Sequence, residues 1–538
     1  MKVLKGIGVS AGVASGKLSF LKRDTQGVQR VEVADTGAEI ARFEAARKQA
    51  ITGLGELYEK TLASLGEEHS LLFQIHQMML EDLDYVDSIT GMISGGVNAE
   101  WAVNETAKQF SEMFAQMDDP YMQARSADVL DVSNRIIRIL TGQEETAFSD
   151  GQPVILAADD LVPSETARLD RNQVLAFVTA HGSSNSHTAI FARTMAIPAI
   201  VNLGDQLTIE DDGKEVFIDG STGLLYVDPD AETTADLIAR REAEEAARIH
   251  REQFRGKPAI TPDGRRMLLC ANIGSPNDVE AALAGDCDGI GLFRSEFLYL
   301  GRDDFPSEDD QYQAYKTVLE GMGDKPVIVR TLDIGADKQA DYFEMPTEEN
   351  PALGVRALRI CLTRPEVFRT QLRALYRASA HGNLSIMFPM VASVWEVRKV
   401  KEICAGIRQE LKTEGYAIEE DVPLGIMIET PAAAVISDLL AKEVDFFSIG
   451  TNDLTQYTLA ADRQNPNIGQ FCDTHHEAVL RLIAHVTKMA HENGIWAGIC
   501  GELGADQTLT KTFVEMGLDE LSMSPGSILK TKAQILDR

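Results

Sequence analysis

The chain has 538 residues, 44% of them hydrophobic, and its 83 acidic and 51 basic residues give a formal net charge of −32. This length exceeds what one hydrophobic core serves and predicts two to four globular domains. The strong negative charge argues against nucleic acids and anionic membrane surfaces as partners, and it leaves a basic protein partner open.

The six cysteines are scattered along the chain without the spacing of metal ligands, and a chain of this size does not depend on disulfides. The first residues lack the apolar core of a signal peptide, and no later stretch has about 18 uninterrupted apolar residues. These features predict a soluble, cytoplasmic protein with reduced thiols.

Residues 1–20 are glycine-rich and alternate small with apolar side chains, which predicts short strands joined by tight turns. A phosphate-binding loop of the form GxxxxGK would need glycine at Ala11 and serine or threonine at Leu18. Neither is present, so we do not assign a nucleotide site here.

Residues 33–144 have a helical pattern with few prolines, which predicts an inserted bundle of several helices. Within it, residues 67–84 combine a methionine-rich apolar face with clustered carboxylates. This stretch is either an ordinary amphipathic helix or a docking surface, in which soft methionine contacts are surrounded by an acidic rim that selects a basic partner.

Residues 146–230 return to short strands and helices and, together with residues 1–20, predict an α/β domain. Its main feature is His187, which lies between the polar turn 182–186 and an apolar-periodic helix. Because serine and asparagine cap helices, we expect His187 at a helix N-terminus, where free N–H groups favour an anion such as phosphate. The alternative is a histidine that only helps to cap the helix.

Residues 231–256 are charged and alanine-rich, which predicts a solvent-exposed linker helix. From 258 to 538, eight apolar strand-like runs alternate with helical patterns, which predicts a (β/α)8 barrel. In this fold the catalytic groups follow the C-terminal ends of the strands. The polar residues at these positions are Asn272, Arg294, Arg330, Glu429, Asn452, Asp453, Cys500 and Ser524.

The rim arginines predict a small anionic substrate, since a guanidinium matches a phosphate or carboxylate, and Arg356 and Arg463 are further candidates in the loops. Glu429 and Asp453 are hard oxygen ligands that suit Mg²⁺ better than zinc; the alternative is that they only pair with the arginines. Cys500 is either a core residue or an acid–base group.

These motifs resemble the enzyme I family of the bacterial phosphoenolpyruvate:sugar phosphotransferase system over essentially the full length. The matching motifs are Pro163-Ser-Glu-Thr166, Ser186-His187-Thr188, Phe293-Arg294-Ser-Glu296, Arg330-Thr-Leu-Asp333, Met427-Ile-Glu429, Gly450-Thr-Asn452-Asp453 and Ile499-Cys500-Gly-Glu502. The resemblance implies a multidomain protein, in which an α/β phosphohistidine swivelling domain with an inserted helical bundle precedes a (β/α)8 TIM barrel.

The resemblance also implies an activity. The enzyme would transfer the phosphoryl group of phosphoenolpyruvate to His187 and then to a histidine of the carrier protein HPr, which starts the sugar phosphotransferase relay. Thr166 would orient the His187 ring, and Cys500 would protonate the leaving enolate. Because His187 and the barrel rim lie in different predicted domains, we expect the α/β domain to swing between two positions.

The family roles extend to binding residues and partners. Substrate binding would fall to Arg294, Arg330, Asn452, Asp453 and Arg463, and Mg²⁺ binding to Glu429 and Asp453. The helical bundle would dock HPr through Glu67, Glu68, His76, Asp82 and Asp84. The barrel would form a homodimer.

Two segments depart from the family pattern. Ser183, Ser184 and Asn185 occupy the last Gly, Arg and Thr positions of the usual Gly-Gly-Arg-Thr-Ser run, so one cation near the histidine is missing. Segment 471–476 lacks the usual proline. Two other readings stay open: a pyruvate phosphate dikinase or phosphoenolpyruvate synthase, which would need a large ATP-binding domain, and a catalytically silent docking paralogue.

Overall fold

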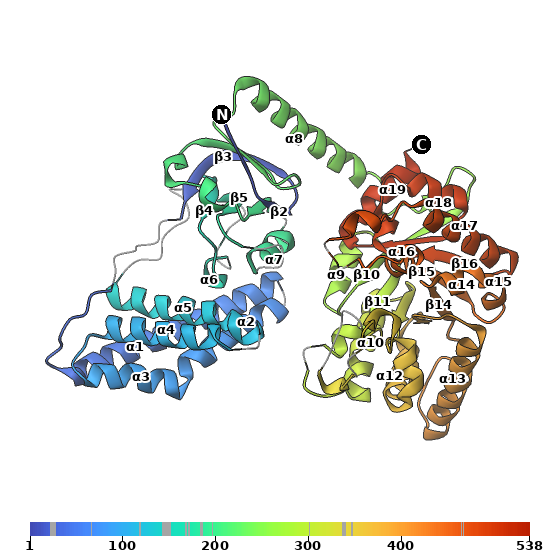
Figure 1. Cartoon of the computed structure of the whole chain (residues 1–538), viewed down its shortest axis with the longest axis horizontal. Coiled ribbons are helices and arrows are strands. Elements are labelled where there is room, and N and C mark those ends of the chain that lie inside the picture. The colour runs from blue at the N-terminus through green and yellow to red at the C-terminus, as the bar shows by residue number, and fades with distance from the viewer. Residues whose placement is uncertain are drawn as a thin grey trace. The chain divides into compact units, whose positions relative to one another are not determined.

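The computed structural model describes residues 1–537 apart from 22–27, 66, 118–119, 143–151, 167–168, 170–172, 183–186, 196, 301, 336–340, 346–347, 464 and 466. The chain divides into two compact units, Met1–Ala246 and Ala247–Arg538 (Figure 1). Helix α8 (Ala231–Glu252) spans the boundary between them, and its residues are mostly exposed. No helix in the described parts of the chain is long and apolar enough to cross a bilayer.

Five helices form a bundle in the first unit: α1 (Thr36–Leu65), α2 (Glu67–Glu81), α3 (Leu83–Ser94), α4 (Ala99–Ala115) and α5 (Pro120–Thr141). Their buried apolar stripes meet in one core, which includes Phe43, Phe73, Leu80 and Ile89. Helix α3 starts at Asp82, whose carboxylate accepts a hydrogen bond of 3.0 Å from the Tyr85 amide. The predicted helical insertion is confirmed.

The rest of the first unit is an eight-stranded sheet in the order β1-β8-β7-β3-β4-β5-β6-β2. The strands are β1 (Lys2–Lys5), β2 (Ile7–Ser10), β3 (Val13–Phe20), β4 (Val154–Ala158), β5 (Val174–Thr179), β6 (Ala199–Val201), β7 (Glu215–Asp219) and β8 (Leu224–Val227). Strands β3 and β4 pair in parallel, so the bundle is inserted between neighbouring strands. Helices α6 (Pro163–Thr166) and α7 (His187–Thr194) follow β4 and β5.

The N-terminal glycines allow close packing of the backbone. A Cβ at Gly8 would lie 2.1 Å from the Gly220 carbonyl oxygen, and one at Gly220 would lie 2.0 Å from that of Ser10. Both glycines are therefore explained by the approach of strand β2 to the turn after β7, without a nucleotide.

The second unit is a closed barrel of eight parallel strands, with the short β9 (Ala259–Ile260) antiparallel to β10. The barrel strands are β10 (Arg266–Ile273), β11 (Ile290–Arg294), β12 (Val327–Arg330), β13 (Leu384–Phe388), β14 (Leu424–Ile428), β15 (Phe446–Ile449), β16 (Trp496–Ile499) and β17 (Glu520–Met523). The predicted (β/α)8 barrel, and with it the expected fold class, is confirmed.

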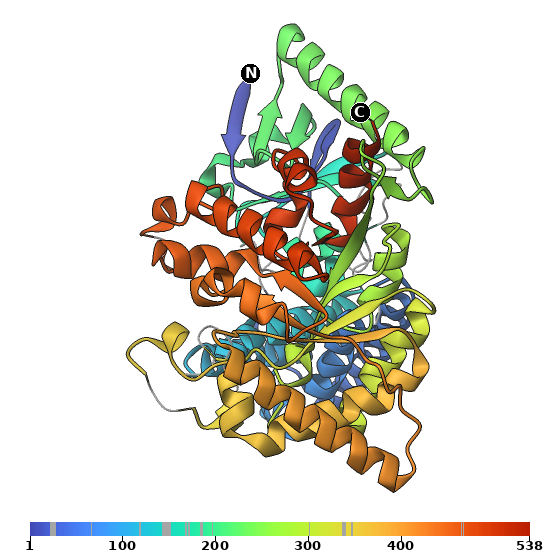
Figure 2. The same ribbon diagram turned by 90° about the vertical axis from the view of Figure 1, so that its right-hand side faces the viewer.

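Helices cover the outside of these strands, as Figures 1 and 2 show for the barrel unit. They are α9 (Asp278–Ala284), α10 (Glu308–Met322), α11 (Leu358–Thr363), α12 (Pro365–Ala378), α13 (Val394–Glu414), α14 (Pro431–Val435), α15 (Ser437–Leu440), α16 (Thr451–Leu459), α17 (Glu477–Glu492), α18 (Thr510–Met516) and α19 (Ile528–Leu536). Helix α10 begins with a capping box formed by Ser307 and Asp310.

Strand alternation determines what fills the inside of the barrel. Buried apolar side chains of five strands and Cys500 pack together there: Leu292, Ile328, Met387, Met427 and Phe446. The ring of Phe446 stacks on that of Trp496 with centroids 4.7 Å apart. Because side chains alternate along a strand, the residue two positions after each interior residue also faces inward. This rule brings Arg294, Arg330 and Glu429 to the C-terminal rim.

Candidate active site

Arg330 lies at the centre of the rim and is held by two carboxylates. It ends strand β12 beside Arg294, its register partner on β11. Its Nη2 donates to Glu296 Oε1, and its Nη1 lies 3.0 Å from Asp333 Oδ2. Burial alone would lower the pKa of Arg330, but the charges of Glu296 and Asp333 raise it. The guanidinium is therefore a fixed positive charge.

The second oxygen of Asp333 holds a second arginine. Arg356 Nη2 donates to Asp333 Oδ1 at 2.9 Å, and Arg356 Nη1 lies 3.5 Å from Asp453 Oδ1. Asp453 is in the first turn of α16, directly after strand β15. Positive and negative groups thus alternate around the rim.

Glu429 follows strand β14 and is 1% exposed. Its Oε1 accepts a hydrogen bond from the Met390 amide. Burial, followed by the charges of Asp453 and Asp333, raises the pKa of Glu429 to about 8, against the opposing effect of the arginines. Two buried guanidiniums face four buried carboxylates in this cluster: Arg330 and Arg356, and Glu296, Asp333, Glu429 and Asp453.

This donor set fits a hard divalent cation. The excess of buried negative charge would be balanced by such an ion, and Glu429 and Asp453 supply oxygen ligands from successive strands. Among the described residues, no three His, Cys, Asp or Glu side chains are grouped as metal ligands. Two carboxylates with the remaining positions left to substrate and water suit Mg²⁺, whereas structural zinc sites use four protein ligands.

Cys500 follows strand β16 and is 2% exposed. Its Sγ lies 3.7 Å from the Ile449 carbonyl oxygen. Burial raises the pKa of the Cys500 thiol to about 11, although a hydrogen bond with Ser448 and the charge of Arg330 oppose the increase. The thiol therefore keeps its proton at neutral pH.

The other predicted barrel residues differ in their environments. Arg294 and Asn452 are half-buried, whereas Arg463 is exposed and its amide donates to Gln456 Oε1 at 3.2 Å. Asn272 has a structural role, because its Nδ2 donates to the carbonyl oxygens of Cys500 at 3.3 Å and Ser522 at 3.4 Å. The structure thus brings Arg330, Arg356, Glu429, Asp453 and Cys500 into one electrostatically coupled cluster.

Three residues that contact this cluster have no role assigned from sequence patterns: Glu296, Asp333 and Tyr457. Asp333 follows Arg330 by three residues, and Tyr457 follows Asp453 by four residues in helix α16. The second spacing places both side chains on one helix face. That spacing is the signal that identifies Tyr457 as a neighbour of the site.

Helix α7 begins at His187, as the capping turn predicts, although the side chain of His187 and residues 183–186 lie outside the described part of the chain. The next residue is firmly placed, because Thr188 Oγ1 donates to the Leu161 carbonyl oxygen at 2.9 Å. Thr166, at the end of α6, is 5% exposed. Ser164 in α6 donates from Oγ to Asp131 Oδ1 of helix α5 at 2.7 Å, which connects the sheet to the bundle.

The predicted docking residues lie on α2 and at the start of α3. Asp82 and Asp84 are exposed beside Met78 and Leu83, which are 68% and 76% exposed. His76 is 0% exposed and lies 3.4 Å from Asp128 Oδ1, so it belongs to the interior of the bundle and not to the exposed surface of Asp82 and Asp84. Glu67 and Glu68 begin α2, but their side chains lie outside the described part.

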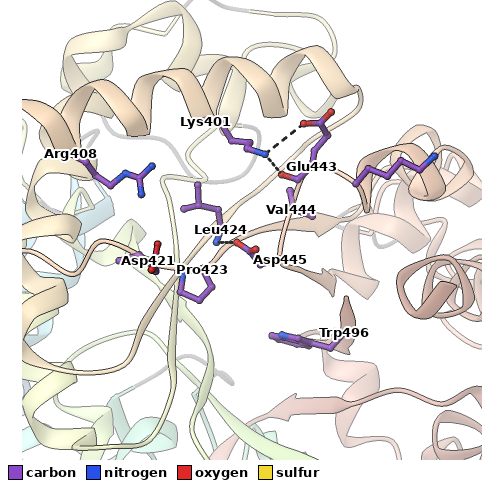
Figure 3. A pocket seen from close by; sticks show the side chains of 11 residues that line it. Lys401, Arg408, Asp421, Pro423, Leu424, Glu443, Val444, Asp445 and Trp496 are labelled. Carbon is purple, nitrogen blue, oxygen red and sulfur yellow. Dashed lines mark hydrogen bonds and ion pairs between the residues drawn. The ribbon is translucent and has the colours of Figure 1, made fainter. Parts of the chain in front are cut away.

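A cavity of about 520 Å³ lies at the opposite end of the barrel, beside the first residues of β14 and β16 (Figure 3). Its three basic residues are Lys401, Arg408 and Lys442, and its three acidic ones are Asp421, Glu443 and Asp445. Several of these groups already have partners: Lys401 donates to the Glu443 carbonyl oxygen at 2.7 Å, and Asp445 accepts from the Leu424 amide at 2.8 Å. The balanced charges give no reason to place the reaction there.

Comparison with known proteins covers both units. A family model for the PEP-binding domain of PEP-utilising enzymes matches residues 248–538, and models for their N-terminal and mobile domains match 5–125 and 151–223. The chain is 43% identical over 537 residues to a phosphoenolpyruvate-protein phosphotransferase of Bacillus subtilis, covering 99% of this chain and 94% of the relative. It is 45% identical over 538 residues to a protein of the same name from Streptococcus equinus, covering 99% and 93%.

Proposed function

Because the chain belongs to the family of phosphoenolpyruvate-protein phosphotransferases, we propose that it transfers the phosphoryl group of phosphoenolpyruvate to His187 and then to a histidine of the carrier protein HPr. This reaction would start the sugar phosphotransferase relay in the cytoplasm. The observation that carries the proposal is the buried cluster of guanidiniums and carboxylates at the barrel rim, with the protonated Cys500 thiol beside it.

Residues of this cluster and of the rim around it have chemical roles in the proposed reaction. Arg294, Arg330, Asn452 and Arg463 would hold the substrate. The Nε of Arg330 is buried without a hydrogen-bond acceptor among the described residues, so it has a donor to offer. Mg²⁺ on Glu429 and Asp453 would neutralise charge on the phosphoryl group. Cys500 would deliver a proton to the enolate.

The phosphoryl acceptor is proposed to be the neutral imidazole of His187. An imidazole is a competent nucleophile near neutral pH, and its N–P bond keeps the phosphoryl group transferable. Thr166 would orient the ring. The α/β domain would swing so that this histidine meets first the barrel rim and then the acceptor protein.

The proposal is tested with phosphorus-labelled phosphoenolpyruvate and Mg²⁺. The wild-type protein is expected to take up one acid-labile label per chain without ATP, and His187→Ala is expected to take up none. His181→Ala is the matched control, because this exposed histidine lies in the same domain. Equal labelling of wild type and His187→Ala would refute the acceptor assignment, and an absolute requirement for ATP would favour a dikinase or synthase.

Docking of HPr is proposed at the α2–α3 corner, where exposed Met78 and Leu83 adjoin Asp82 and Asp84. We expect Leu83→Ala to weaken HPr binding about tenfold, because burial of a leucine contributes about 1.5–3 kcal/mol. Asp82→Asn keeps the helix cap but removes the charge, so binding should become less salt-dependent. Ile249→Ala on α8, 54% exposed, is the control. Unchanged titrations for both docking variants would exclude this surface.

A homodimer through the barrel domain completes the proposal. Trp395 and Val435 are both 63% exposed on helices α13 and α14, and an aromatic and a branched aliphatic side chain at this exposure suit an interface. Sedimentation at several concentrations is expected to give a monomer–dimer equilibrium that Trp395→Ala shifts towards monomer. A dimer that this variant leaves unchanged would exclude Trp395 from the interface.

A further inference from the structure

Tyr457 joins the active-site cluster through its hydroxyl group. Helix α16 carries Asp453 and, one turn later, Tyr457, so both side chains lie on one face. The Tyr457 hydroxyl accepts a hydrogen bond from Arg356 Nη1 at 3.1 Å and donates its own to the Ala352 carbonyl oxygen. Since a phenol has one proton to donate, this arrangement fixes the hydroxyl as the acceptor for the arginine.

Arg356 has few acceptors besides this hydroxyl. Its Nη2 donates to Asp333 at 2.9 Å, and its buried Nε lacks an acceptor among the described residues. Its Nη1 reaches Tyr457 at 3.1 Å but Asp453 Oδ1 only at 3.5 Å, the outer limit of a hydrogen bond. The phenol therefore holds the shorter of the two contacts made by this nitrogen.

The position of Arg356 matters because Asp453 is one of the two carboxylates that would bind the divalent cation of the proposed function. A guanidinium paired closely with a carboxylate occupies its oxygens and competes with a metal ion for them. If the phenol hydroxyl were removed, Nη1 would be left buried without a good acceptor, which is costly, and Asp453 would be its nearest replacement.

We propose that Tyr457 is a positioning residue that holds Arg356 away from Asp453 and so keeps this carboxylate available to the divalent cation. This inference rests on the metal site of the proposed function. It differs from a purely structural role, in which Tyr457 would only tether segment 351–353 through Ala352. A tether would affect stability and substrate affinity but not metal affinity.

The test is direct binding of Mn²⁺ to the full-length protein without phosphoenolpyruvate. Electron paramagnetic resonance measures the binding. Tyr457→Phe is expected to weaken Mn²⁺ binding about tenfold, as losses of groups that orient metal ligands do. Tyr342→Phe is the matched control, because the hydroxyl of half-buried Tyr342 also donates to a backbone carbonyl, at 2.5 Å from Tyr299 O, outside the cluster. Thermal unfolding of both variants monitors their folding.

A second variant tests whether Tyr457 acts through Arg356. In an Arg356→Lys background, which removes the forked donor, Tyr457→Phe should change Mn²⁺ affinity less than twofold. An undiminished tenfold effect in that background would overturn the inference, and so would wild-type Mn²⁺ affinity in Tyr457→Phe itself.

Glu429→Gln separates failure of the inference from failure of the metal site. Suppose that wild type binds Mn²⁺, that Glu429→Gln does not bind it, and that Tyr457→Phe binds it as tightly as wild type. In that case only the positioning role is wrong. If Glu429→Gln binds Mn²⁺ as tightly as wild type, the metal site and the positioning role are both wrong.

Discussion

Replacement of Glu520 by glutamine should remove a pH dependence from the stability of the barrel. Glu520 opens strand β17 inside the barrel and is 2% exposed, and its Oε1 lacks a hydrogen-bond partner among the described residues. Gly291 leaves room for it, since a Cβ there would lie 2.3 Å from Oε1. Burial raises the pKa of Glu520 from 4.5 to about 8, although a hydrogen bond with Cys270 opposes the increase.

The sign of the effect follows from this raised pKa. Below pH 4.5 the carboxyl is neutral in both the folded and the unfolded chain; above it, only the unfolded chain releases the proton, until the pH passes about 8. Stability contributed by the neutral carboxyl is therefore lost as pH rises through this window, by about 1.4 kcal/mol per pH unit. From pH 5.5 to 7.5 the free energy of unfolding of wild type should fall by about 3 kcal/mol relative to Glu520→Gln.

Urea unfolding monitored by tryptophan fluorescence measures this difference, because Trp395 and Trp496 both lie in the barrel unit. The quantity compared is the change between the two pH values, so a constant offset from the buried amide does not matter. Glu515→Gln, on the exposed surface of α18, should run parallel to wild type. Parallel curves for wild type and Glu520→Gln would refute the reasoning.

Three further outcomes are expected. Cys472 is half-exposed, whereas the other five cysteines are buried. A thiol reagent should therefore label one group rapidly in the folded protein and none in Cys472→Ser. Rapid labelling of several thiols in wild type would contradict this. Ser164→Ala leaves Asp131 without its 2.7 Å hydrogen bond and should cost about 1–3 kcal/mol in the thermal unfolding of the first unit, where an unchanged melting curve would argue against the contact. Ser307→Ala breaks the capping box of α10 and should cost about 1 kcal/mol, which Ser307→Asp should restore.

The barrel and its rim could be predicted because they depend on local patterns. The apolar runs fix the strands, and strand alternation directs Arg330 and Glu429 inward two residues after Ile328 and Met427. Helix capping likewise places His187 at the start of α7. These features can be predicted without knowing which segments of the chain meet in space.

The partners within the rim could not be predicted, because they join segments far apart in sequence. Arg356 meets Asp453 across 97 residues, and Arg330 meets Glu296 across 34. Which carboxylate pairs with which arginine depends on loop conformation rather than on periodicity. For this reason the sequence predicts Arg330 as a substrate ligand but not that its two Nη groups are already held by Glu296 and Asp333.

The burial of His76 was not predicted for a different reason. His76 lies three residues after Phe73 and four before Leu80, a spacing that puts all three on one helix face. Phe73 and Leu80 belong to the bundle core, and the rings of Phe73 and His76 meet edge to face at 6.0 Å. The helical period therefore assigns His76 to the core, while the acidic character of the neighbouring sequence suggests a surface. The helical period is the stronger signal, because the face of the helix on which a side chain lies determines whether that side chain is buried.

Three carboxyl groups buried in the same barrel are stabilised in three different ways. Asp333 is flanked by two guanidiniums, and Glu520 stays protonated in an apolar interior. Burial and the nearby charges of Asp453 and Asp333 raise the pKa of Glu429 to about 8 against the arginines, so at neutral pH this carboxyl either keeps a proton or gains a cation. A divalent ion between Glu429 and Asp453 would displace that proton and remove the repulsion together. The carboxylate with the least compensated charge is thus the one best suited to reaction chemistry, and Tyr457 would keep its neighbour Asp453 open to the same ion.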